Sequence, residues 1–201
     1  MRRAVLFALM MTLLLTACGG DGEKDEAQLL QQQYAAVAAA ELAADIICHY
    51  GDEVREYSLT CDYTPETSRV TVTAPEELAG ISAEVADGRL QLDYNEISMD
   101  AGTYSGGGLS PVTVLPELMQ AAAEGYIAEM SREERGGQQC LRLGFDMSSD
   151  MSRVYTTWFE SESILPLYSE VCWNGEVVYR VIWSRFAVTE QKQVEDPTAN
   201  G

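Results

Sequence analysis

The sequence contains little positive charge, with 13 Lys and Arg against 32 Asp and Glu among its 201 residues. Its formal net charge is −19, and a field of that sign repels the phosphates of nucleic acids and anionic lipid head groups. Nucleic acid is therefore excluded as the expected partner, whereas cations and basic partners stay open. Because 46% of the residues are hydrophobic, the chain can still bury one sizeable core.

The sequence also lacks the motifs of metal and phosphate sites. It has no Cys-x-x-Cys pair and no His-rich zinc spacing, and its glycine-rich segment 102–108 lacks the Lys-Ser/Thr of a phosphate loop. The single histidine, His49, lies near the end of a predicted strand on the face opposite Ile46 and Cys48, a position typical of a solvated side chain. We therefore predict no catalytic residue, no metal and no cofactor. A hydrolase that uses paired carboxylates stays open as an alternative.

No hydrophobic run is long enough to cross a membrane. The longest, residues 4–15, falls short of the ~20 residues that a spanning helix needs. Arg2 and Arg3 precede it, and Leu15-Thr16-Ala17-Cys18 follows it directly, a pattern that resembles the lipobox of a bacterial lipoprotein. This pattern predicts a signal peptide over residues 1–17 and a diacylated Cys18 that anchors the protein to the extracytoplasmic face of the cell membrane. An ordinary cleaved signal with a chance cysteine is the alternative.

Behind the anchor, the composition predicts one domain between two polar segments. Residues 19–27 have no apolar side chain larger than Ala, so residues 18–27 are expected to form a flexible tether. Residues 189–201 are expected to form a polar tail. The domain between them, residues 28–188, starts with a helix over residues 28–44, because Leu30, Tyr34 and Val37 recur at helical spacing.

From residue 45 the hydrophobic period changes to two, which indicates strands. Expected strands lie around Ile46 and over residues 57–63, 70–73, 81–85, 90–94, 126–132, 139–145, 154–159, 167–173 and 177–186. Residues 101–111 read as a flexible loop, and residues 112–124 as a short second helix that ends at Gly125. The prediction is an α+β fold, with a curled antiparallel sheet of about nine or ten strands forming an incomplete barrel and with helices covering its mouth.

Four cysteines besides Cys18 fall on the predicted strands: Cys48, Cys61, Cys140 and Cys172. A turn at residues 51–53 would place Cys48 opposite about residue 56 and Cys61 opposite about residue 44, more than ~10 Å apart and too far for a disulfide. Cys140 and Cys172 fall on strands that the strand at 154–159 separates, so a disulfide between them is also disfavoured. Cross-pairing such as Cys48 with Cys140 stays open beside free buried thiols, which we favour.

Several segments together resemble a known family. They are the helix and hairpin ending at Tyr63, the run Leu-Ser-Pro at residues 109–111 with Leu-Pro-Glu-Leu at 115–118, and Thr-Trp-Phe-Glu-Ser-Glu-Ser-Ile-Leu-Pro at 157–166, followed by Glu170 and the Asn174-Gly175 turn. With Cys18, they are similar to the LolA/LolB-like lipoprotein carriers, including small cortex- and germination-related lipoproteins of spore-forming Firmicutes. Glu160 stands where an aspartate is usual. The resemblance implies a half-barrel closed by helices around an apolar cavity, which in the carriers accepts acyl chains.

The leading functional hypothesis is a non-enzymatic, membrane-anchored lipoprotein that binds an acyl chain or a lipoprotein in this cavity. Leu115, Leu118 and Met119 of the second helix are expected to form a movable lid, since Met adapts to ligands of different shape and the glycines before the helix allow it to move. Trp158 and Trp183 are expected to line the cavity from the strands. The alternative is a lipoprotein with a self-filled core that docks an envelope protein, for example in cortex or cell-wall processes.

Overall fold

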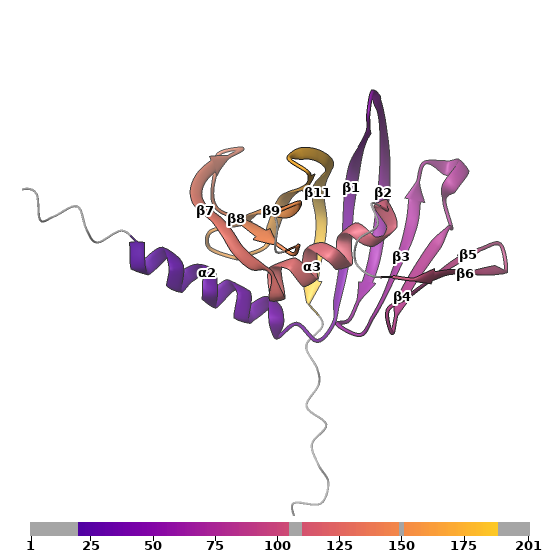
Figure 1. Ribbon diagram of the computed structural model, residues 1–201, viewed down its shortest axis with the longest axis horizontal. Helices are drawn as coiled ribbons and strands as arrows, with labels where there is room; N and C mark the ends of the chain where they lie inside the picture. Colours follow the sequence, from indigo (N-terminus) through magenta and orange to yellow (C-terminus); the bar gives the residue numbers. More distant parts are fainter. Residues whose placement is uncertain (1–19, 105–109, 149–150, 189–201) are drawn as a thin grey trace, which may run out of the picture.

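The computed structural model describes residues 20–104, 110–148 and 151–188. The predicted signal peptide, Cys18 and the predicted tail lie outside these residues. Within them lie two α-helices, α2 (Gly20–Ala35) and α3 (Val114–Glu124), and eleven strands (Figure 1). The strands are β1 (Ala40–Tyr50), β2 (Glu53–Tyr63), β3 (Thr67–Ala74), β4 (Ser82–Ala86), β5 (Arg89–Tyr94), β6 (Ile97–Thr103), β7 (Tyr126–Arg135), β8 (Gln138–Asp146), β9 (Arg153–Glu160), β10 (Pro166–Trp173) and β11 (Glu176–Val188).

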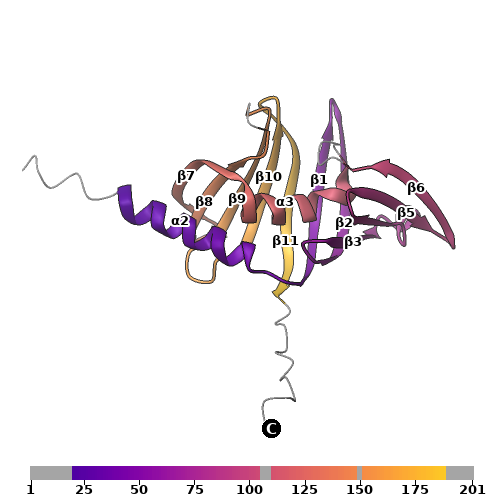
Figure 2. The same ribbon diagram turned by 60° about the horizontal axis from the view of Figure 1, so that its bottom comes forward.

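All eleven strands belong to one antiparallel sheet with the order β6-β5-β4-β3-β2-β1-β11-β10-β9-β8-β7. Each half of the sheet is a meander, and the two halves meet where β1 pairs with β11. A twisted sheet of this width curls, and here it curls around α2 and α3, which lie on its concave side (Figure 2). The sheet stays open, with β6 and β7 at its edges. The predicted α+β half-barrel is confirmed, with eleven strands in place of nine or ten.

The core fills the space between the concave face and the helices. Along β1, buried and more exposed side chains alternate, and Leu42, Ile46 and Cys48 point into this core. Helix α3 begins after a single 3₁₀ turn (Pro111–Thr113), carries Pro116 in its first turn and ends at Glu124, with Gly125 as its C-cap, close to the prediction. A Cβ atom on Gly125 would lie 2.6 Å from the Ala121 carbonyl oxygen and 2.8 Å from the Phe145 Cβ, so only glycine fits there.

The first helix lies eight residues or more before its predicted position, since α2 ends at Ala35 and β1 begins at Ala40. The alanine-rich segment 40–44 has helical propensity, but Ala40 and Leu42 are buried in the core and pair with β2 and β11. Tertiary pairing overrides such propensities, which are weak. Residues 20–27, assigned above to a tether, form the first half of α2, and Ala27 is only 1% exposed.

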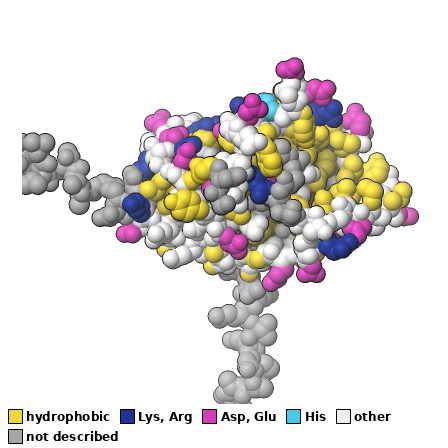
Figure 3. Space-filling view, viewed as in Figure 1, with side chains coloured by type: hydrophobic (Ala, Val, Ile, Leu, Met, Phe, Trp, Pro, Cys, Tyr) yellow, Lys and Arg dark blue, Asp and Glu magenta, His cyan; other side chains and the backbone are white. Residues whose placement is uncertain are grey.

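The sequence analysis missed β6 and assigned its last residues to a loop. In β6 every residue except Gly102 is exposed, so the strand has no alternation of burial that a hydrophobic pattern could report. Its position at the edge of the sheet explains this exposure. Hydrophobic side chains remain visible at the end of the molecule where β5 and β6 lie (Figure 3).

The four described cysteines are free thiols, as the sequence favoured. In the first hairpin, Cys48 lies opposite Arg55 and Cys61 lies opposite Leu42, close to the predicted register. Cys140 packs in a small cluster apart from the main core to which Cys48 belongs, so the cross-pairing between these two is not formed.

Candidate functional site

The space expected to hold a ligand is almost completely filled by side chains. A gap of about 10 Å³ remains between α3 and the sheet, lined by Tyr34, Leu118, Met119, Ala122, Thr157, Phe159, Pro166 and Trp183. A single water needs roughly 10–15 Å³, so no acyl chain fits in this conformation. Leu118 and Met119 are 3% and 2% exposed and Leu115 is fully buried, which places the predicted lid residues in the core.

Trp158 does not line this gap, although Trp183 does. Phe159, the next residue after Trp158 in β9, points into the main core, and successive side chains on a strand point to opposite faces. Trp158 therefore lies on the outer face, where it packs with Cys140 and Tyr168 and donates a hydrogen bond of 2.8 Å from Nε1 to Oε2 of Glu133. The prediction that Trp158 faces the cavity is wrong for this reason.

A larger apolar groove of about 300 Å³ lies beside the gap. It is formed by the end of α2, the connection between β9 and β10, and the end of β11, and its lining residues are Gln33, Tyr34, Ala36, Val37, Ser163, Ile164, Leu165, Phe186 and Val188. Its volume is at the lower end of the ~300–1,000 Å³ typical of small-molecule sites. The lining is mostly apolar, so the groove suits a hydrocarbon chain.

Tyr34 lines both the gap and the groove. The centre of its ring lies 5.3 Å from that of Phe159 on the gap side and 5.6 Å from that of Phe186 on the groove side. Its hydroxyl donates a hydrogen bond of 3.0 Å to the carbonyl oxygen of Ile164. Burial raises the pKa of the Tyr34 phenol far above its usual value, so the hydroxyl stays a neutral donor.

The acceptor of this bond belongs to a strained turn. Ile164 has a φ of 55°, in the left-handed region that a β-branched residue rarely adopts. Strain of this kind costs about 1–3 kcal/mol and often marks segments that change conformation. Tyr34 and this turn thus lie where the groove meets the interior gap.

A second buried feature, which the sequence analysis missed, is centred on Glu117 of α3. Its carboxylate accepts hydrogen bonds from the hydroxyls of Tyr104, Thr113 (3.0 Å) and Tyr155 (2.6 Å). Burial raises the pKa of Glu117, and these three hydroxyls together with the charge of Arg153 oppose that shift. The cluster joins α3 to β9 and to the segment after β6, so it holds the helix over the sheet.

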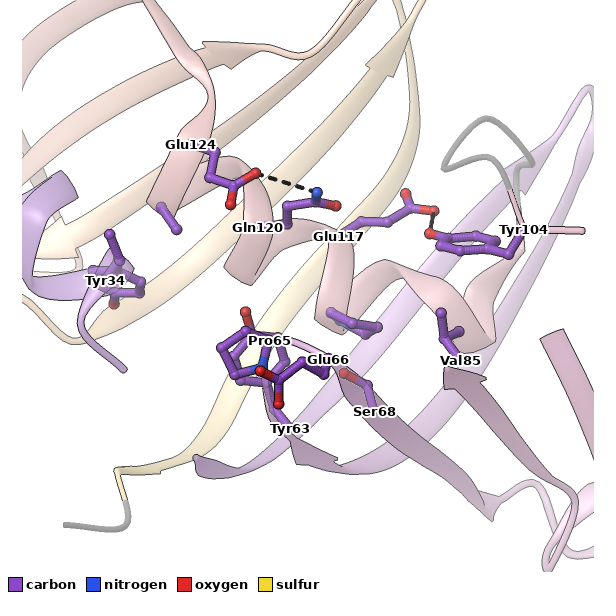
Figure 4. Close-up of a pocket in the computed structure, with 13 residues that line it drawn as sticks. Tyr34, Tyr63, Pro65, Glu66, Ser68, Val85, Tyr104, Glu117, Gln120 and Glu124 are labelled. Atoms are coloured by element: carbon purple, nitrogen blue, oxygen red, sulfur yellow. Dashed lines mark hydrogen bonds between the residues drawn. The ribbon is translucent and has the colours of Figure 1, made fainter. Parts of the chain in front are cut away.

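A third pocket, of about 160 Å³, opens beside Glu117 and is shown in Figure 4. Tyr34, Tyr63 and Tyr104 line it together with the carboxylates of Glu66, Glu117 and Glu124, and Gln120 donates a 3.5 Å hydrogen bond to Glu124. Three carboxylates repel an anionic group and disfavour a purely apolar one. This pocket therefore does not suit the acyl chain of the leading hypothesis.

The described residues offer no arrangement typical of a nucleophile or a metal site. His49 is half-buried, and its Nε2 lies 2.7 Å from Nη1 of Arg180. Burial raises the pKa of the Cys48 thiol to about 11 and that of Cys61 to about 12, so both stay protonated near neutral pH. Within the described ranges, no three His, Cys, Asp or Glu side chains gather as metal ligands would, and no helix has the length and hydropathy to cross a bilayer.

Comparison with known proteins identifies the fold. No protein family and no curated protein matches the chain by sequence. A putative outer membrane lipoprotein-sorting protein domain from Vibrio parahaemolyticus is similar in structure, with a TM-score of 0.52, 8% identity and coverage of 89% of this chain and 97% of that one. An uncharacterized conserved protein from Thermus thermophilus gives a TM-score of 0.51 at 9% identity, with 84% and 89% covered.

A LolA superfamily protein from Nitrosomonas europaea also matches, with a TM-score of 0.47 and 11% identity over 85% of this chain and 94% of that one. At such low identities these likenesses concern the fold alone. The half-barrel expected from the sequence is thus a fold that this chain shares with the lipoprotein-sorting domain.

Proposed function

We propose that this protein is a non-enzymatic lipoprotein, anchored through Cys18 to the extracytoplasmic face of the cell membrane, that binds a hydrophobic chain between α2 and the half-barrel. One observation carries the ligand proposal: an apolar groove of about 300 Å³ shares the Tyr34 side chain with the interior gap. The lipobox-like pattern before Cys18 supports the anchor. The fold shared with a lipoprotein-sorting domain supports the ligand part of the proposal.

The energetics favour a chain that enters from the groove. Each buried CH₂ contributes about 0.8 kcal/mol, so several methylenes offset the loss of one Tyr34 hydrogen bond, which is worth roughly 0.5–1.5 kcal/mol. The first part of an acyl chain lies in the groove, and rotation of Tyr34 then admits its end toward the gap. The ligand class is therefore a single acyl chain of a lipid or lipoprotein.

The first prediction is that a dansyl-labelled fatty acid binds the chain from residue 19 onward, with a dissociation constant in the micromolar range or below. Leu165→Asp is expected to weaken this binding at least tenfold, because Leu165 lines the groove and a carboxylate there would be desolvated by the bound chain. Leu165 is 41% exposed, so the fold tolerates the change. Fluorescence titration measures the affinity.

The matched control is Val54→Asp, which adds the same charge at a 56% exposed position near the turn of the β1–β2 hairpin, outside the groove. It is expected to leave the affinity unchanged. Polar substitutions of Leu118 and Met119 are unsuitable because these residues are buried in the core. A wild-type protein without saturable binding would refute the ligand proposal.

The second prediction concerns the anchor. Cys18→Ala removes the sulfur on which the lipid is built, so the protein is expected to move from the membrane to the soluble fraction or to accumulate with its signal peptide uncleaved. Cell fractionation and intact-protein mass spectrometry measure both results. Cys61→Ala is the control, because it removes a thiol but not the proposed anchor. Unchanged fractionation and mass of the Cys18 variant would end the lipoprotein reading.

A second candidate function is docking of an envelope protein. The specific observation in its favour is the gap of only about 10 Å³, which makes this a self-filled core in the conformation described. In addition, exposed hydrophobic side chains lie on β5 and β6, away from the groove.

A further inference from the structure

We propose that β6 and the adjoining face of β5 dock an extended, basic segment of a partner protein, which adds to the sheet as a further strand. This inference rests on the second candidate function and does not require a ligand in the groove. Three observations carry it: an uncovered apolar face, an unpaired strand edge and a surplus of carboxylates around both.

The uncovered face continues the concave, apolar side of the sheet beyond the helices. Register places Leu92 opposite Met99 and Tyr94 opposite Ile97, so these side chains share one side. Leu92 also lies opposite Ala83, which lies opposite Val70 of the main core. Ile97 is 70% exposed and Met99 57% exposed, so the apolar side of this half-sheet has no cover at its end (Figure 3).

The opposite side of the same strands is polar and internally paired. Arg69 of β3 contacts Glu84 at 2.9 Å and Asp93 at 3.3 Å, and Gln91 donates to Asp93 and to Ser98 at 3.1 Å each. A sheet with one polar and one apolar side normally buries the apolar side. Since α2 and α3 do not cover the apolar side of β5 and β6, a partner protein would bury it.

The edge of β6 offers backbone groups to such a partner. β6 is the terminal strand of the sheet, so none of the strands in the described part of the chain pairs with its free side. Proteins usually protect such edges with lysine, proline or bulges, but Ile97–Thr103 contains neither lysine nor proline. The only irregularity in the pairing of β5 with β6 lies after Asp100. From Ile97 to Asp100 the four residue pairs are regular, so no bulge protects this part of the edge. An extended segment can therefore add to this edge by backbone hydrogen bonds.

The negative charge around β6 favours a basic partner segment over a second copy of this chain. Glu96 and Asp100 lie on or beside β6, and Asp87 and Asp93 lie close by. Two arginines face these four carboxylates, and both are already paired, Arg89 with Asp100 and Arg69 with Asp93. A second copy of the chain, with a formal net charge of −19, would bring like charges together at this edge. A segment with Lys or Arg at alternate positions and apolar side chains between them would match both the carboxylates and the apolar face.

The position of the edge argues for a protein partner over the bilayer. Helix α2 begins at one end of the molecule and β5 and β6 lie at the other, in both ribbon views (Figure 1 and Figure 2). The proposed anchor, Cys18, is two residues before Gly20 in the sequence, where α2 begins. An anchored molecule would thus present β6 away from the membrane.

The test uses the mature chain and an N-acetylated, fluorescein-labelled peptide of four Lys-Val repeats. We expect saturable binding by fluorescence anisotropy, and a loss of at least tenfold in affinity with Ile97→Lys, which places a like charge at the docking edge. Val54→Lys, an equal charge change at an exposed apolar position near the β1–β2 turn, is expected to retain wild-type affinity. Peptides of Glu-Val repeats and of Lys-Gly repeats are expected not to bind saturably.

Equal weakening by Ile97→Lys and Val54→Lys, or equal binding of the Lys-Gly peptide, would show unspecific attraction and overturn the proposal. A dimer seen by light scattering for the wild type and lost in Ile97→Lys would identify a second copy as the occupant, and would also overturn it. The fatty-acid titration of the Ile97→Lys protein separates the two functions. If the wild type binds the fatty acid but not the peptide, the docking proposal is refuted and the groove proposal stands. If it binds the peptide but not the fatty acid, the groove proposal is refuted and the docking proposal stands.

Discussion

Replacement of Glu117 by alanine is expected to lower the free energy of unfolding by about 3 kcal/mol or more. The substitution removes the acceptor of three hydroxyls, and those of Thr113 and Tyr155 lie on buried residues. A buried polar group left without a partner costs roughly 1–3 kcal/mol, and members of one network are coupled. Urea unfolding followed by circular dichroism measures the loss. Glu124→Ala, an exposed position on the same helix, is the control and should change stability by about 0.5 kcal/mol or less.

The same residue predicts a pH dependence with a definite sign. Because burial raises the pKa of Glu117 above its usual value of 4.5, folding favours the protonated carboxyl. Its contribution to stability is then fully present below that value and is lost as the pH rises through the raised pKa. The stability of the wild type relative to Glu117→Gln should therefore fall as the pH is raised from 4 toward neutrality.

Comparison with a variant isolates this group from the other carboxylates. Asp93 and Asp100 have lowered pKa values, because hydrogen bonds from Ser98 and from the Gly102 amide, respectively, stabilise their charged forms. The contributions of Asp93 and Asp100 to the stability of the fold are lost as the pH falls, but this loss is the same in the wild type and in the variant. A difference that is flat across the pH range, or that grows toward neutrality, would contradict the burial of an ionisable Glu117 carboxyl.

The sequence predicted the strands that turn apolar side chains toward the core. β9, β10 and β11 have boundaries close to the expected ones because buried residues such as Phe159 and Val181 recur on one face. The start of β1 and all of β6 were missed for opposite reasons. The alanines of β1 carry a local helical preference that pairing overrides, and the exposed residues of β6 carry no pattern at all.

The candidate site was less predictable because it depends on how segments pack. The hydrophobic spacing of α3 predicted that Leu118 and Met119 face the sheet, but the volume left beside them depends on Tyr34 and Trp183 from distant segments. Glu117 gave no signal, since its three partners come from the chain before α3, from the turn at its start and from β9. A single sequence does not reveal such convergence. The alternation of side chains along a strand, in contrast, can be read from the sequence, and it would have placed Trp158 on the face opposite Phe159.

That reversed position of Trp158 gives the last prediction. Trp158→Ala is expected to lower the free energy of unfolding by roughly 3–5 kcal/mol, the range for truncation of a buried tryptophan. On the outer face its ring packs edge-on to Tyr168 at 5.3 Å, and the guanidinium groups of Arg135 and Arg142 lie 5.1 and 5.4 Å from its centre. Its hydrogen bond also holds the pKa of Glu133 below the usual value.

A milder variant divides these contributions. Trp158→Phe keeps an aromatic ring beside Tyr168 and loses the Nε1 donor to Glu133, so its cost should be smaller, about 1–2 kcal/mol. Both variants should bind the labelled fatty acid as the wild type does at temperatures where they remain folded, because the groove and the gap lie on the other face of the sheet. Weakened fatty-acid binding in the stable Trp158→Phe protein would place Trp158 in a ligand site after all. A normal unfolding free energy for Trp158→Ala would show that the outer-face cluster does not stabilise the half-barrel.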